Sequence, residues 1–140
     1  MHGTDLTVAL LARGQSDLLP ISLAHLELQT FPAARFEILV VSQDAAKDSR
    51  QILERYAASA PIRTRLLYCN EEFSAHARNL AVENAGGLWV LFLADDLLVG
   101  PSLVESHVRE QERHGGACAL RGCIQQHPQL DPRVLTRWRD

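Results

Sequence analysis

Short apolar runs alternate with amphipathic segments along most of the 140-residue chain. The runs are too short for helices and have the length of buried strands. They are Leu6–Leu11, Phe36–Val41, Ile62–Tyr68 and Leu88–Leu93, with Ala117–Leu120 as a candidate fifth strand. Leu88–Leu93 is the most hydrophobic of them, so we expect it to be the central strand, buried on both faces.

Between these runs, apolar residues recur at the spacing of one helix face. The predicted helices run from an N-cap at Ser16-Asp17 to 29–32, from Asp48 or Ser49 onward, from a Ser74 cap to Gly86-Gly87, and from Ser102 to Gly115-Gly116. Their expected apolar faces carry Leu19, Leu23 and Leu26 in the first helix, Ile52, Leu53 and Tyr56 in the second, and Ala77, Leu80, Ala81 and Ala85 in the third. Ser102 and Glu105 have the spacing of a capping box, and the two glycine pairs are interpreted as helix stops.

Four strand–helix repeats with short connections predict βαβ crossovers. The expected fold is therefore α/β, a three-layer αβα sandwich with a mainly parallel sheet. The pattern weakens after Gly122, so we expect a domain over residues 1–122 and a tail over 123–140. Ligands of such sheets bind beyond the carboxyl ends of the strands, which directs attention to the loops that follow each run.

Composition narrows the classes of partner. A net charge of −3 and a single lysine argue against nucleic-acid binding and against attraction to an anionic membrane. No apolar run approaches the ~20 residues of a membrane-spanning helix, and no leader pattern is visible at the N-terminus. Cys69, Cys118 and Cys123 lack the spacing of a zinc site or a disulfide framework. We expect a cytoplasmic protein with reduced thiols.

The sharpest chemical feature is Asp95-Asp96, which directly follows the most apolar run. Two adjacent carboxylates at a strand end repel one another and lose solvation. A divalent cation relieves both costs, and Mg²⁺ or Mn²⁺ commonly shares its ligands between carboxylates and substrate phosphates. The alternative interpretation is that one aspartate simply caps the following turn.

The aspartate pair is the last of several short motifs that follow one another along the chain. Ala77-Arg78-Asn79 lies in the third helix, followed by Gly86-Gly87, the apolar run and Asp95-Asp96, and Gln29–Pro32 precedes the second run. This order resembles family 2 glycosyltransferases over roughly residues 6–122. The resemblance implies a GT-A fold whose Rossmann-like first half binds a nucleotide-activated sugar.

The resemblance also implies roles for individual residues. Asp96 would be a ligand of Mg²⁺ or Mn²⁺ bridging the donor diphosphate, and Asp95 would face the ribose or the sugar. Arg78 would lie near the nucleotide pocket, although it also fits a solvated surface arginine. A cation at the diphosphate stabilises the negative charge that gathers as the glycosidic bond breaks.

Two loops depart from the family pattern. Ala12 and Arg13, expected to contact the donor, stand where the family usually has a Pro-Thr-Tyr-Asn-like run. The usual Asp-Asp-Gly-Ser is replaced by Ser42, Gln43 and Asp44. Asp44 could read the base with a shift of one residue, or Gln43 could pair with it through its amide.

The function implied is inverting glycosyl transfer from a nucleotide-sugar to an unknown sugar, lipid or protein acceptor. No residue has the context expected of a catalytic base, and residues 123–140 could begin an acceptor half. The alternative is a non-catalytic nucleotide-binding or interaction module derived from a truncated glycosyltransferase, with an oligomeric partner or a C-terminal half covering the sheet. The glycine fingerprint of dinucleotide binding is absent.

Overall fold

The computed structural model describes residues 3–13, 18–43, 47–70, 73–125 and 128. The elements are β1 (Leu6–Ala12), α1 (Leu19–Glu27), a 3₁₀ turn η1 (Ala33–Arg35), β2 (Phe36–Ser42), α2 (Lys47–Ser59), β3 (Thr64–Tyr68), α3 (Phe73–Asn84), β4 (Trp89–Ala94) and α4 (Leu103–Arg113). The predicted alternation of strands and helices is confirmed, with boundaries shifted by one to three residues.

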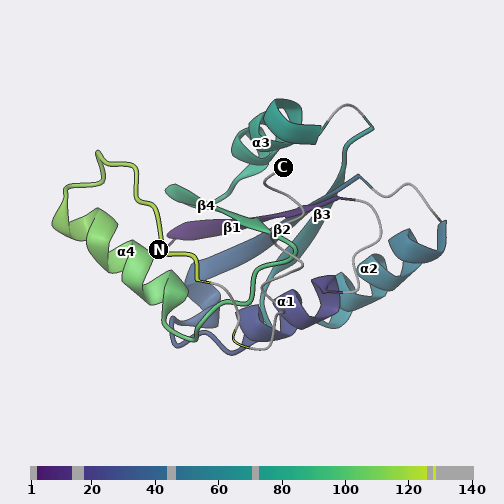
Figure 1. Ribbon diagram of the computed structural model, residues 1–140, viewed down its shortest axis with the longest axis horizontal. Helices are drawn as coiled ribbons and strands as arrows, with labels where there is room; N and C mark the ends of the chain where they lie inside the picture. The colour runs from purple at the N-terminus through teal and green to yellow at the C-terminus, as the bar shows by residue number, and fades with distance from the viewer. Residues whose placement is uncertain (1–2, 14–17, 44–46, 71–72, 126–127, 129–140) are drawn as a thin grey trace.

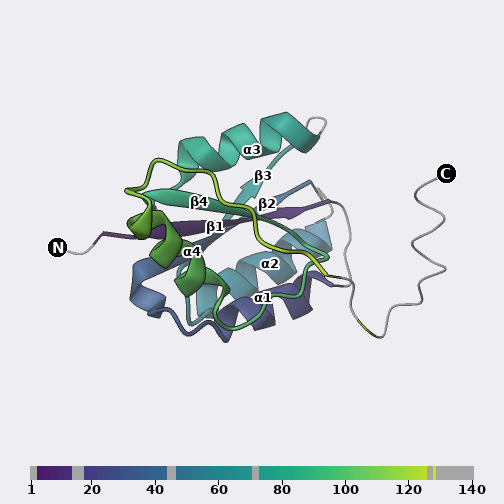
Figure 2. The same ribbon diagram turned by 60° about the vertical axis from the view of Figure 1, so that its left-hand side comes forward.

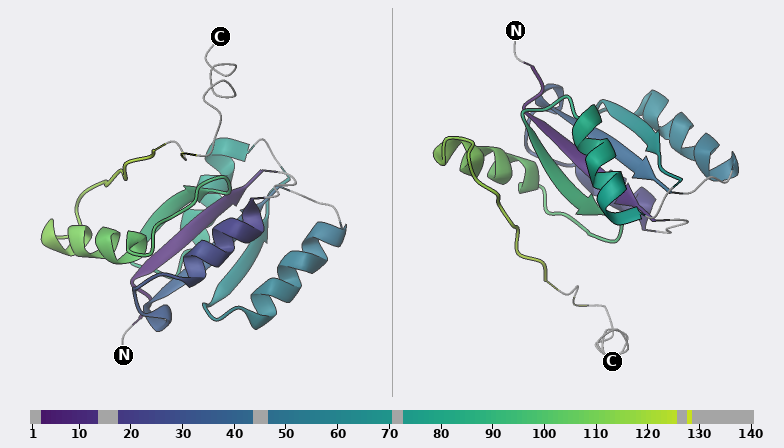
Figure 3. Two further views of the ribbon diagram at one scale, coloured as in Figure 1. Left: turned by 60° about the horizontal axis from the view of Figure 1, so that its bottom comes forward. Right: turned by 90° about the horizontal axis from the view of Figure 1, so that it is seen from above.

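The four strands form one parallel sheet in the order β3-β2-β1-β4. Helix α1 connects β1 to its neighbour β2, and α2 connects β2 to β3. Helix α3 then connects β3 to β4, which pairs with β1 on the side away from β2. Figure 1 shows α3 above the sheet with α1 and α2 below it, and the left view of Figure 3 shows α1 and α2 side by side. The predicted three-layer α/β fold is confirmed.

Alternation along β1 divides the core between the two faces of the sheet. Leu6, Val8 and Leu10 pack in the cluster that includes the apolar side chains of α1 and α4. Ala9 and Leu11 point the other way, into a smaller cluster built on α3. All seven residues of β1 and of β2 are buried, so these two strands form the centre of the sheet.

The prediction that Leu88–Leu93 forms the central strand is wrong. β4 pairs with β1 alone among the described strands, and of its residues only Leu93 is buried. Leu88 is 75% exposed and Phe92 is 38% exposed. A hydrophobic run predicts that a strand is buried by other parts of the protein, but it does not predict whether the strand lies in the centre or at the edge of the sheet. Ala117–Leu120 is not a strand either, and Figure 2 shows the chain after α4 as an extended trace.

Several helix details also differ from expectation. Ile52 is 64% exposed while Leu53 is 6% exposed, because α2 covers the sheet with a narrower stripe than the sequence suggests. Leu18 is the N-cap of α1 and makes no side-chain cap bond, and the predicted cap at Ser16-Asp17 lies outside the described residues. α3 begins one residue before Ser74.

The buried carboxylate of Glu37 links several elements at the amino-terminal ends of the strands. Glu37 is fully buried and accepts bonds from Thr7 Oγ1 at 2.9 Å, from Arg65 Nη2 at 2.8 Å and from Gly86 N at 2.8 Å. Gly87 lies against β1 so closely that a Cβ would stand 2.6 Å from the Leu6 carbonyl carbon. Gly86-Gly87 therefore allows close packing on β1 rather than ending α3 in a left-handed turn.

At α4, the predicted C-terminal stop is confirmed and the predicted N-terminal capping box is not. Gly115 and Gly116 have φ of +71° and +74°, which confirms the predicted glycine stop. Ser102 is the N-cap but makes no side-chain cap bond; the Val104 N–H instead donates to Oε1 of Gln29, two residues after α1, at 3.0 Å. Within the described residues, none of the helices is both long and apolar enough to span a membrane.

Candidate functional site

The order of the strands creates a switch point between β1 and β4. The connection after β1 leads to α1 on one face of the sheet, whereas β4 is reached from α3 on the other face. The order of the strands thus reverses at β1, with β2 on one side of it and β4 on the other, and α/β sheets bind ligands beyond the carboxyl ends of the strands at such a point. Leu11 pairs with Ala94, so Ala12 and Asp95 leave the sheet beside each other.

Asp95-Asp96 lies on the β4 side of this switch point. The pair forms a turn directly after Ala94, and the Leu97 N–H donates to the Ala94 carbonyl at 3.3 Å. Asp95 is half-buried with its Oδ2 atom buried, whereas Asp96 is exposed. One carboxylate is therefore fixed against the protein and the other faces solvent, where a cation or a ligand can reach it.

The carboxylate pair fits a metal site whose other ligands come from a substrate better than a site formed by protein side chains alone. Among the described residues, no group of three or more histidine, cysteine, aspartate or glutamate side chains could hold a metal ion. Magnesium and manganese are held by one or two carboxylates where substrate phosphates complete the coordination. The oxygen donors of Asp95 and Asp96 suit that arrangement.

The other predicted donor contacts surround the same edge. Ala12 is fully buried at the end of β1, and its carbonyl accepts the Gln43 N–H at 3.0 Å. Arg13 is exposed and Gln43 is half-buried, both just beyond their strands. Asp44 lies outside the described residues, so the choice between Gln43 and Asp44 as reader of the base stays open.

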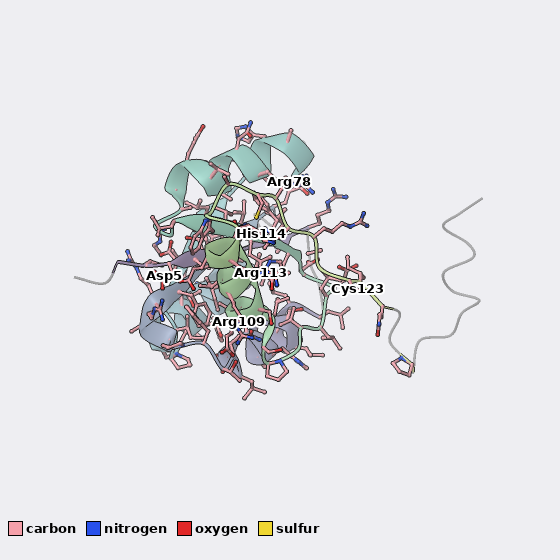
Figure 4. The ribbon with its side chains drawn as sticks, turned by 90° about the vertical axis from the view of Figure 1, so that its left-hand side faces the viewer. Asp5, Arg78, Arg109, Arg113, His114 and Cys123 are labelled. Atoms are coloured by element: carbon pink, nitrogen blue, oxygen red, sulfur yellow. The ribbon has the colours of Figure 1, made fainter. Side chains whose placement is uncertain are left out.

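Arg78 lies on α3, on the other side of the sheet from α1. Ala77 and Ala81 are fully buried against the sheet and fix the rotation of the helix, which leaves Arg78 exposed. Figure 4 shows Arg78 on α3, well away from Asp5 at the amino-terminal end of β1. The structure thus brings Ala12, Arg13, Gln43, Asp95 and Asp96 to one edge, with Arg78 on the helix that begins there.

Sequence reasoning missed a pair of residues at this edge. The Arg50 guanidinium lies 4.2 Å from the centroid of the Tyr68 ring. Within the described part of the chain, Arg50 Nε and Tyr68 Oη are buried and have no hydrogen-bond partner. Tyr68 is opposite Ser42 in the sheet, so it lies next to Gln43. The signal was present, because Tyr68 ends a predicted strand at the ligand-binding edge.

The electrostatics of this pair are mixed. Burial raises the pKa of the Tyr68 hydroxyl, and the negative charge of Glu54 raises it further, while Arg50 opposes both. Tyr68 therefore keeps its proton at neutral pH and can donate a hydrogen bond. Together, the Tyr68 hydroxyl and Arg50 Nε offer two donors to a ligand with acceptor oxygens, such as the carbonyls of a nucleobase.

Comparison with known proteins decides the family. The family model for glycosyl transferase family 2 matches residues 7–139. The chain belongs to glycosyltransferase family 2. The expectation drawn from the order of its motifs is thereby confirmed.

Two curated relatives of this family 2 chain are bacterial. The poly(ribitol-phosphate) beta-N-acetylglucosaminyltransferase TarS of Staphylococcus aureus is 28% identical over 100 residues, which cover 71% of this chain and 18% of TarS. The succinoglycan biosynthesis protein ExoM of Rhizobium meliloti is 28% identical over 94 residues, 67% of this chain and 30% of ExoM. The family 2 chain thus spans less than a third of these relatives.

Solved structures share the GT-A fold of this family 2 chain. Residues 1–349 of S. aureus TarS, in complex with UDP-GlcNAc, match with a TM-score of 0.69 at 21% identity, over 80% of this chain and 32% of that one. The mannosyltransferase PcManGT of Pyrobaculum calidifontis, in complex with GDP-Man and Mn²⁺, matches with a TM-score of 0.61 at 24% identity, over 70% and 29%.

Proposed function

We propose that this chain is the donor-binding part of a glycosyltransferase, which binds a nucleotide-activated sugar together with Mg²⁺ or Mn²⁺ and serves inverting sugar transfer. The observation that carries the proposal is the placement of Asp95-Asp96 at the β1/β4 switch point of a family 2 chain. The TarS complex with UDP-GlcNAc and the PcManGT complex with GDP-Man and Mn²⁺ support this class of ligand.

The site residues divide between the two ends of the donor. Asp96, exposed in the turn after β4, would hold the metal at the diphosphate, and Asp95 would face the ribose or sugar. The base would lie beyond β2 and β3, beside Gln43 or Asp44, where Tyr68 and Arg50 offer donors to its carbonyl oxygens. Ala12 and Arg13 would contact the donor from the end of β1.

The chemistry asked of these residues is binding and charge stabilisation. When bound, the metal supplies positive charge to the departing diphosphate. Asp95 and Asp96 provide oxygen ligands on a short turn, and Arg78 adds a cation on the helix that begins at the same edge. Since the chain carries a net charge of −3, its surface as a whole does not neutralise a diphosphate, and these local cations have to do so.

We assign the donor-binding role to residues 1–122 and treat residues 123–140 as a tail or the start of an acceptor part. The proton of the acceptor hydroxyl must pass to a general base during an inverting transfer. We assign no residue of this chain to that step, and the acceptor is not identified. Binding of the nucleotide without any turnover would favour the alternative of a non-catalytic nucleotide-binding module.

Calorimetric titration of the chain with UDP-GlcNAc and with GDP-mannose, each with and without Mn²⁺, tests the proposal. We expect Mn²⁺ to raise the affinity for at least one of them about tenfold, which is about 1.4 kcal/mol. Mn²⁺ alone should bind weakly, because no three or more His, Cys, Asp or Glu side chains among the described residues are grouped to hold it. ATP with Mn²⁺ is the control for unspecific phosphate binding. Absence of binding by both nucleotide-sugars contradicts the proposal.

A further inference from the structure

One polar face of α1 is bonded to the segment that carries the aspartate pair. Ser22 and His25 are three residues apart on α1, so their side chains share one side of the helix, and Gln29 lies two residues after its end. Figure 1 shows the segment between β4 and α4 running past α1. The side chains of these three residues bond to backbone carbonyls along that segment, although the two are more than seventy residues apart in sequence.

Ser22 makes the contact nearest to the aspartates. It is 2% exposed, and its hydroxyl donates to the Asp95 carbonyl at 2.9 Å and to the Leu97 carbonyl at 3.1 Å. A hydroxyl has one proton, so these two contacts form a single three-centre bond. The two accepting carbonyls lie on either side of Asp96. Ser22 therefore holds the backbone of the turn at the residue proposed to bind the metal.

The remaining bonds fix the rest of the segment. His25 Nδ1 lies 3.2 Å from the Val99 carbonyl, which requires a proton on Nδ1. The Gln29 amide donates to the Gly100 carbonyl at 2.8 Å and accepts the Val104 N–H at 3.0 Å, so it also caps α4. The segment between β4 and α4 is thus anchored at its start by Ser22 and at its far end by Gln29.

We infer that Ser22 is a positioning residue, which sets the geometry of the Asp95-Asp96 turn and thereby its affinity for a metal–nucleotide complex. This role rests on the proposed function. Ser22 is buried beneath the turn and bonds only to its backbone carbonyls in the contacts described above, so it acts through Asp96 rather than on the ligand. A displacement of about an ångström in a supporting contact is enough to weaken a preorganised site markedly.

Ser22→Ala removes the hydroxyl with little change in volume. Ser59→Ala is the matched control, because the Ser59 hydroxyl also donates to a backbone carbonyl, that of Arg55 at 3.1 Å, on the exposed end of α2. Each variant is titrated with UDP-GlcNAc and GDP-mannose in the presence and absence of Mn²⁺. Amide hydrogen exchange of residues 95–99 is measured on the ligand-free chains.

We expect Ser22→Ala to weaken binding about tenfold in Mn²⁺ and to leave metal-free binding within about twofold, because the loss acts through the metal ligand. Exchange at residues 95–99 should become faster. Ser59→Ala should change neither. Ser22→Cys, which keeps a weak donor of similar size, should fall between wild type and alanine.

Equal weakening with and without Mn²⁺, or unchanged binding and unchanged exchange in Ser22→Ala, overturns the positioning role while leaving the proposed function in place. If the wild-type chain binds neither nucleotide-sugar, the proposed function fails and the role of Ser22 fails with it. The wild-type titration therefore separates the two failures.

Discussion

Asp96→Ala is expected to abolish the effect of Mn²⁺ on nucleotide-sugar binding. The variant should bind the donor in Mn²⁺ no more tightly than wild type binds it without metal, a loss of about tenfold or more, equivalent to at least about 1.4 kcal/mol. Asp96 is exposed at the switch point between β1 and β4, and no described group of three or more acidic, histidine or cysteine side chains could replace it as a metal site. Calorimetric titration in Mn²⁺ and in EDTA measures the effect.

Glu83→Ala is the matched control for Asp96→Ala. Glu83 is an exposed carboxylate near the far end of α3, so its removal changes the net charge equally without touching the turn after β4. It should leave the Mn²⁺ effect intact. If Asp96→Ala retains the full Mn²⁺ effect, the metal does not bind at Asp96. If Glu83→Ala loses the effect as well, the lost charge rather than the position of Asp96 explains the result.

The second large effect concerns folding. Glu37→Gln is expected to lower the free energy of unfolding by about 3 kcal/mol, the cost of breaking a buried ion pair by removing one charge. Glu37 is fully buried and receives bonds from Thr7, Arg65 and Gly86, so its loss leaves Arg65 without its carboxylate. Because Arg65 is a third exposed, water recovers part of that loss. Urea denaturation followed by circular dichroism measures the change, with exposed Glu83→Gln as control.

The same carboxylate predicts how stability depends on pH. Burial alone would raise the pKa of Glu37, but the bonds from Arg65, Gly86 and Thr7 outweigh it and hold the pKa below its ordinary value of 4.5. The unfolded chain therefore binds the proton more readily than the folded one. The contribution of Glu37 is fully present above pH 4.5 and is lost as the pH falls through the folded value. Glu37→Gln should lack this part of the acid dependence; an unchanged acid profile contradicts the assignment.

The sequence predicts which segments form strands and helices better than it predicts their neighbours. Strand length and apolar runs are local properties, and β1 and β2 follow from them directly. The place of β4 depends on which elements pack beside it, and its apolar residues look the same at an edge or in the centre. The prediction that Ile52 is buried is wrong for a related reason, because helical spacing does not determine how many neighbouring positions of a helix face are buried.

The candidate site shows the same division. Asp95-Asp96 could be predicted because it ends an apolar run within a familiar order of motifs. The contact that holds it could not, because Ser22 reaches the Asp95 carbonyl across more than seventy residues of sequence. Arg50 and Tyr68 are brought together by the packing of α2 beside β3, and each alone has an ordinary sequence context.

Amide NMR spectra of the ¹⁵N-labelled chain, saturated with the tighter-binding nucleotide-sugar and titrated with substoichiometric Mn²⁺, test the metal–donor site most directly. A bound paramagnetic ion broadens the signals of nearby residues. We expect the signals of Asp95, Asp96 and Leu97 to disappear first, while those of Glu37 and Gly86 persist at the opposite edge, about 20 Å away by the rise of a strand. Persistent signals at Asp95 and Asp96 while other residues broaden would contradict the proposed site.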